Sequence, residues 1–235
     1  MNTQPWEKQA RTDRPQPRPF GPTPRTRGVT LNWMAPFYDH VCRIMGLGPT
    51  FRERTIKIAA LRPGESVLDV GCGTGVLTRL AARAVGSAGM VRGIDPAPDM
   101  IRVAKETAGR LGSTAGFRLA AIEHLPFEDA TFDAALASVM IHHLPPDLKR
   151  IGLKEVYRIL RPGGRLVVVD LDRPSHPLWW LAIWPMRFHS PLAEHVHGRV
   201  PDYLRKAGFE PVETAGRWAG LLTFWVARKP SDVSR

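Results

Sequence analysis

The chain has 235 residues, 43% of them hydrophobic, which is enough to bury one sizeable core and excludes a purely disordered protein. Its net charge of +11 would attract polyanions, either nucleic acid or an anionic membrane leaflet, and charge alone does not choose between them. Two cysteines make a disulfide framework unlikely, and no stretch reaches the roughly 18 apolar residues that span a bilayer.

The first 28 residues are rich in Pro and Arg, and we expect them to form a disordered basic tail. No apolar signal region stands at the N-terminus, so a cytoplasmic location is expected, with a membrane-peripheral one left open. Residues 29–230 are predicted to form a single domain. Within it, residues 29–60 precede the first strand and residues 173–199 interrupt the later pattern with several prolines.

Strands and helices alternate after residue 60, which predicts an α/β fold with helices on both faces of a parallel sheet. The predicted strands are 66–70, 90–94, 117–120, 132–138, 164–170, 209–213 and 222–228. The predicted helices are 75–85, 97–111, 147–160 and 200–207. Arg161-Pro-Gly-Gly164 supplies the stop and the turn after the third of these helices.

The sequence Ser-Val-Leu-Asp-Val-Gly-Cys-Gly-Thr-Gly, residues 66–75, predicts a buried strand that ends in a ligand-binding turn. A dinucleotide fold would need G-x-G-x-x-G, but Val76 stands where the third glycine belongs. No Gly-Lys-Ser or Gly-Lys-Thr follows, which disfavours a nucleoside triphosphate. Asp69 in this strand and Asp95 at the end of the next suit an amino group and a ribose diol.

Residues 67–75 resemble the glycine motif of class I S-adenosylmethionine-dependent methyltransferases, and Gly93-Ile-Asp95 resembles their ribose-binding acid. The likeness continues through Glu123-His-Leu-Pro-Phe-Glu-Asp-Ala-Thr-Phe-Asp133, His142-His-Leu-Pro145 and Glu155-Val-Tyr-Arg-Ile-Leu-Arg-Pro-Gly-Gly164. These segments are similar to the ubiquinone/menaquinone-biosynthesis C-methyltransferase-like branch, over roughly residues 30–172. The resemblance implies a Rossmann-like, seven-stranded, doubly wound sheet, mostly parallel with an antiparallel last strand.

The resemblance also implies S-adenosylmethionine as cofactor and assigns a set of residues to it. These are Tyr38, Asp69, Gly71, Cys72, Gly73, Thr74, Asp95, Pro96, Met100, Ala121, Ile122, Glu123 and Ser138. Tyr38 belongs to residues 29–60, which the resemblance identifies as the N-terminal lid of the domain. The chain departs from the family at Ala121, where an Asp or Asn is usual, so we expect Ile122 backbone groups or Glu123 to contact the adenine.

His142 and His143 follow the fourth predicted strand, at the sheet edge where open α/β folds bind ligands. An imidazole can take a phenol or enol proton at neutral pH, which makes either histidine a candidate general base. A loop-packing or cofactor-side role, and chemistry by proximity without a base, stay open. His189, His195 and His197 lie at no firm metal-ligand spacing, so no metal is expected.

The segment 173–199 contains three tryptophans, and in the family an insertion at this place covers the acceptor pocket. Large aromatic side chains imply a bulky apolar small-molecule acceptor, and tryptophans flanked by arginines also suit contact with a membrane surface. The resemblance favours methyl transfer to a lipophilic quinol or phenol ring, on carbon or oxygen. Phospholipid N-methylation is the alternative within the class. RNA methylation is a second alternative, disfavoured because no Asn/Asp-Pro-Pro-aromatic motif follows Ser138.

Overall fold

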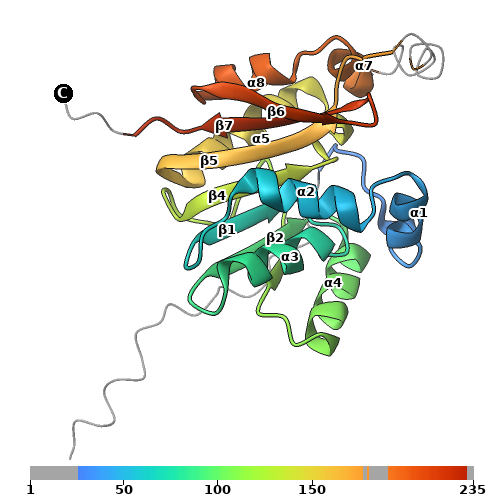
Figure 1. Cartoon of the computed structure of the whole chain (residues 1–235), viewed down its shortest axis with the longest axis vertical. Coiled ribbons are helices and arrows are strands. Elements are labelled where there is room, and N and C mark those ends of the chain that lie inside the picture. The colour runs from blue at the N-terminus through green and yellow to red at the C-terminus, as the bar shows by residue number, and fades with distance from the viewer. Residues whose placement is uncertain (1–25, 177–178, 180–189, 232–235) are drawn as a thin grey trace, which may run out of the picture.

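The computed structural model describes residues 26–176, 179 and 190–231. A seven-stranded sheet in the order β3-β2-β1-β4-β5-β7-β6 crosses the molecule (Figure 1). Only β7 runs against the others, so the fold expected from the sequence is confirmed. The strands are β1 Ser66–Val70, β2 Met90–Asp95, β3 Gly116–Leu119, β4 Phe132–Ser138, β5 Leu160–Leu171, β6 Val212–Trp218 and β7 Leu222–Arg228.

Helices cover both faces of this sheet because successive strand residues point to opposite sides and both sides are apolar. The helices are α1 Tyr38–Ile44, α2 Pro49–Ala59, α3 Val76–Val85, α4 Pro98–Arg110, α5 Pro146–Ile159, α7 Ser190–Val196 and α8 Val200–Ala207. Val67 packs with α2, α3 and α4 on one face, whereas Leu68 packs with α5 and α8 on the other. Figure 1 shows α2 and α3 in front of the sheet and α5 behind it.

Two predicted strand boundaries are wrong. β5 begins at Leu160 instead of residue 164, because Leu160 already pairs with Phe132 and a bulge absorbs the Pro-Gly-Gly turn. β6 spans residues 212–218 instead of 209–213, since Phe209 is buried in the core and Pro211 has no N–H to donate to the ladder. β6 is a largely exposed edge strand and therefore lacks the apolar pattern that predicts strands.

The N-terminal part of the domain divides into two pieces. α2 packs on the sheet, with Ala59 fully buried and Phe51 nearly so. Residues 26–45, which include the short 3-10 helix η2 (Asn32–Met34) and α1, instead lie at the edge where the parallel strands end (Figure 1). Most of the predicted tail, residues 1–25, and much of the tryptophan-rich segment, residues 177–178 and 180–189, lie outside the described residues.

Candidate functional site

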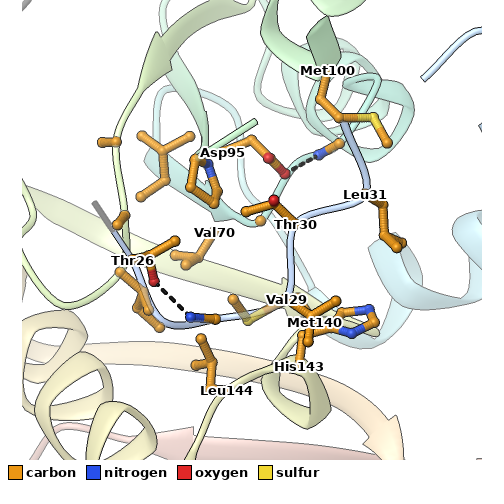
Figure 2. A pocket seen from close by; sticks show the side chains of 18 of the residues that line it. Thr26, Val29, Thr30, Leu31, Val70, Asp95, Met100, Met140, His143 and Leu144 are labelled. Atoms are coloured by element: carbon orange, nitrogen blue, oxygen red, sulfur yellow. Dashed lines mark hydrogen bonds between the residues drawn. The ribbon is translucent and has the colours of Figure 1, made fainter. Parts of the chain in front are cut away.

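A pocket opens at the carboxyl ends of β1, β2 and β4, which is where an open α/β sheet binds its ligand. Ten of the residues predicted from the sequence line it: Tyr38, Gly71, Gly73, Asp95, Pro96, Met100, Ala121, Ile122, Glu123 and His143. Residues 26–31 cross the pocket as a strap (Figure 2). The sequence predicted residues 29–31 as the start of a lid and placed residues 26–28 in the tail. We use the name strap for residues 26–31 below.

The glycine turn approaches its neighbours so closely that no side chain fits. Gly71 has a φ of +69°, and a Cβ there would lie 2.8 Å from the Cβ of Met140. A Cβ on Gly73 would lie 3.3 Å from the ring of Tyr38. The N–H groups of Cys72, Gly73 and Gly75 are donated within the protein, to the Ile94 carbonyl, the Asp95 carboxylate and the Cys72 carbonyl. The turn between β1 and the N-terminus of α3 therefore has a fixed shape, and its glycines expose backbone to the pocket.

Asp95 ends β2 and holds the turn in place. Its carboxylate accepts hydrogen bonds from the Gly73 N–H at 3.0 Å and the Ala97 N–H at 2.9 Å. Each carboxylate oxygen accepts more than one bond, so both oxygens retain capacity for a ligand in the pocket. Burial raises the pKa of Asp95. The same carboxylate thus shapes the turn and faces the site.

Asp69 is almost completely buried below the turn. It lines a second, adjoining cavity together with Tyr38, Cys72, Ser138 and the guanidinium-bearing Arg52. The Thr78 hydroxyl donates to its carboxylate at 2.6 Å. Burial raises the pKa of Asp69 to about 7, so this carboxyl group changes its charge near neutral pH.

Thr74 lies apart from both cavities, although the sequence places it in the cofactor turn. Its hydroxyl donates to Asp39 at 2.8 Å, and Arg52 donates to the same carboxylate oxygen at 3.3 Å. This contact ties α1 to the glycine turn. The side chain of Thr74 therefore holds α1 against the site, while its backbone remains part of the turn.

The far end of the pocket is lined by Ala121, Ile122 and Glu123, of which the first two are buried. The Oε2 atom of Glu123 is buried and has no hydrogen-bond partner within the described part of the chain. A buried carboxylate oxygen without a partner costs free energy unless a ligand donates to it. The position is therefore an acceptor for a ligand N–H group.

His142 is held by a fully buried carboxylate, Asp170, at the end of β5. The Nδ1 atom of His142 lies 2.7 Å from Asp170 Oδ1, while Oδ2 accepts from the backbone N–H of Ile141 at 2.7 Å. Burial alone would raise the pKa of Asp170, but the histidines beside it and these hydrogen bonds hold it well below its usual range. An ionised Asp170 requires a donor on Nδ1, which leaves the lone pair on Nε2 of His142.

His143 has a different environment from its neighbour. It lines the first pocket, and its ring centroid lies 4.0 Å from that of His142. Its backbone carbonyl accepts a hydrogen bond from the Val29 N–H of the strap. Burial, together with the adjacent His142, lowers the pKa of His143 to about 4. The ring is therefore neutral at pH 7 and a weak base.

His195, on α7, packs beside the same pair. Its Nδ1 lies 3.1 Å from the Leu171 carbonyl and 3.8 Å from Asp170 Oδ1. Burial lowers its pKa. His197 is exposed, and His189 lies outside the described residues. Among the residues that the structure describes, no group of three His, Cys, Asp or Glu side chains could hold a metal ion.

Two further residues of the site were missed by the sequence analysis. Asp170 ends an apolar strand, the same signal that drew attention to Asp95, and could have been found in that way. Val139, directly after β4, has a φ of +53°, a strained conformation for a β-branched residue that the pattern does not reveal. It positions Met140 against the glycine turn.

Comparison with known proteins gives a consistent result. A family model described as a methyltransferase domain matches residues 67–164. The 2-phytyl-1,4-naphtoquinone methyltransferase of Synechococcus elongatus is 35% identical over 149 residues, 62% of this chain and 63% of that protein. The demethylmenaquinone methyltransferase of Staphylococcus aureus is 37% identical over 144 residues, 60% of this chain and 58% of that protein. The chain thus spans less than two thirds of either relative's length.

The fold is shared with a solved SAM-dependent methyltransferase from Aquifex aeolicus. The TM-score is 0.66 at 23% identity, and the match covers 86% of this chain and 100% of the other. In this chain, the glycine turn, the strand-end carboxylates and the paired histidines lie at the edge of the sheet where this fold binds ligands.

Proposed function

We propose that this chain is an S-adenosylmethionine-dependent methyltransferase that methylates a quinol- or phenol-type ring of a lipophilic acceptor. Two observations support this proposal. The pocket and the adjoining cavity offer groups that match each part of the cofactor, and the carboxylate-held His142 stacks on His143, which lines the pocket. Both similar relatives are named as methyltransferases of naphthoquinone or menaquinone compounds.

The residues of the pocket fit S-adenosylmethionine. The backbone of the glycine turn and the buried Asp69 of the adjoining cavity suit the amino-acid end, and Asp95 retains acceptor capacity for two ribose hydroxyls. The unpartnered Oε2 of Glu123 would accept from the adenine amino group, which replaces the contact that Ala121 cannot make. When bound, the cofactor supplies a methyl group on a sulfonium, so the protein needs no metal to activate it.

The remaining task of the protein is to remove a proton and to exclude water. A phenol or quinol hydroxyl attacks, or activates its ring carbon, most readily as the anion. His142 Nε2 would accept that proton, and Asp170 would stabilise the resulting imidazolium and keep the ring oriented. Apolar side chains around the pocket, among them Leu31, Met140 and Leu144, limit water near the reacting centre.

The affinity for S-adenosylmethionine should increase about tenfold between about pH 6 and about pH 7.5. Asp69, whose pKa is raised to about 7 by burial, is mostly neutral at the lower pH. The cationic ligand favours the ionised carboxylate, so binding releases a proton below pH 7 and gains strength as pH rises until Asp69 is ionised in both states. Titration calorimetry in buffers of different ionisation enthalpy measures both effects. The Asp69→Asn variant should show a flat profile, and a wild-type profile equally flat would contradict the role of Asp69.

The acceptor can be tested with methyl-labelled S-adenosylmethionine. The full chain is incubated separately with a prenylated naphthoquinol, with phosphatidylethanolamine and with total RNA. The proposal expects label in the quinol, lost in the His142→Gln variant and retained in part in the His143→Gln variant. Label in phosphatidylethanolamine alone would select the phospholipid alternative, and label confined to RNA would overturn the assignment.

A further inference from the structure

Large apolar side chains gather on the outer surface of the segment that covers the pocket. Trp33 is 77% exposed, Phe37 68%, Ile44 75% and Met45 68%. Single exposed apolar residues are ordinary on a protein surface, but a cluster of four within 13 residues marks an interaction site. In the described part of the chain, the other large apolar side chains exposed in this way are Val29, Leu111, Ile151 and Trp179.

The spacing of the apolar residues in and around α1 places several of the exposed side chains on one face of the helix. Phe37, Val41 and Ile44 stand at positions i, i+4 and i+7 and therefore share one face. Tyr38 and Cys42, also four apart, face the site and are the ones that pack inward. The apolar surface of α1 is therefore wider than the part that packs against the rest of the domain. A helix with an apolar arc left open on its outside is typical of elements that lie on a lipid interface.

The charges near this surface favour an anionic partner. The polar side of α1 carries His40 and Arg43, and its one acid, Asp39, already accepts bonds from Thr74 and Arg52. Six Lys or Arg residues and only two acids precede Gly28 in the sequence, and the whole chain carries +11. Apolar side chains flanked by cations match the headgroup region of an anionic leaflet.

We propose that residues 33–45 dock this protein on an anionic lipid surface, with Trp33, Phe37, Ile44 and Met45 inserted among the headgroups and Arg43 at the charged layer. Figure 1 shows α1 on the side toward which the parallel strands run, the side that carries the pocket. In this orientation the site faces the lipid. The proposal rests on the proposed function in one respect, that a lipophilic acceptor is drawn from the surface on which the protein docks.

Vesicle sedimentation of the full chain tests this directly. The chain is mixed with vesicles of phosphatidylcholine alone or with about one third phosphatidylglycerol, at low and at high salt. We expect binding to the anionic vesicles that weakens with salt. The double variant Trp33→Ser/Phe37→Ser should bind at least tenfold more weakly. The control Leu111→Ser/Ile151→Ser removes two apolar side chains that are 58% and 47% exposed elsewhere, and should bind like the wild type.

Retained binding of S-adenosylmethionine by calorimetry shows that the Trp33→Ser/Phe37→Ser variant is folded, so its weak vesicle binding cannot be attributed to unfolding. Equal binding of the two double variants, or equal binding to neutral and anionic vesicles, would overturn the proposal. If the wild-type chain does not bind vesicles but sediments as a dimer, while the Trp33→Ser/Phe37→Ser variant sediments as a monomer, a second copy of the chain covers this apolar surface instead. None of these measurements uses turnover, so they separate a failure of docking from a failure of the proposed activity.

Discussion

Replacing Asp95 with Ala should lower the affinity for S-adenosylmethionine about a thousandfold, below what calorimetry detects, while the sheet stays folded. Two ribose hydroxyls would donate to this carboxylate, and bonds to a charged acceptor contribute about 1.5–3 kcal/mol each. The substitution also removes the acceptor of the Gly73 and Ala97 N–H groups, which loosens the glycine turn. The sum of about 4 kcal/mol corresponds to the expected loss of affinity.

Asp133 offers a matched control for this prediction, since it is a structural carboxylate at the opposite end of the strands. It accepts from the Ser66 N–H at 2.8 Å and from Arg161 at 2.6 Å. Asp133→Ala should therefore lose about as much unfolding free energy as Asp95→Ala, yet bind the cofactor normally. Unchanged affinity in Asp95→Ala would show that the ribose contact is misassigned. An equal loss of affinity in both variants would attribute the effect to stability.

The central sheet could be predicted from the sequence because buried parallel strands are continuous apolar runs, and here the ligand-side acids follow or end them. That local signal located Asp69 and Asp95 and the turn between them. It is equally present at Asp170, where four apolar residues of β5 lead to an acid. The two histidines stand out in the sequence as candidate bases, whereas the carboxylate that contacts one of them lies 28 residues further along the chain.

Other parts of the site depend on contacts between distant segments and leave no local pattern. The strap is anchored beside the pocket by the backbone hydrogen bond from the Val29 N–H to the His143 carbonyl. Any pair of residues with a free N–H and carbonyl could form this bond. Likewise, the Thr74 hydroxyl meets Asp39 across 35 positions of the chain, and nothing near either residue signals the contact. The different environments of the two histidines are also of this kind, because they depend on which ring contacts Asp170.

Replacing Asp170 with Asn should lower kcat with a quinol acceptor by about 10²- to 10⁴-fold, with little change in cofactor affinity. The amide is nearly isosteric, and its oxygen can still accept from the Ile141 N–H. Its NH₂ group would then face Nδ1 of His142 and select the tautomer that carries the proton on Nε2, so the ring could no longer accept a proton there. Steady-state kinetics together with S-adenosylmethionine calorimetry measures the two quantities separately.

The pH profile distinguishes this positioning role from a general loss of structure. In the variant, kcat should rise about tenfold per pH unit toward alkaline pH, because hydroxide takes over the proton that His142 no longer accepts. A variant that is merely loosened would keep the wild-type profile at a lower amplitude. His143→Gln is the matched control: its ring is a weak base, so its loss should leave the shape of the profile unchanged. If His143→Gln changed the profile and Asp170→Asn did not, the base would be His143, and the buried carboxylate would serve only to anchor the loop through the Ile141 N–H.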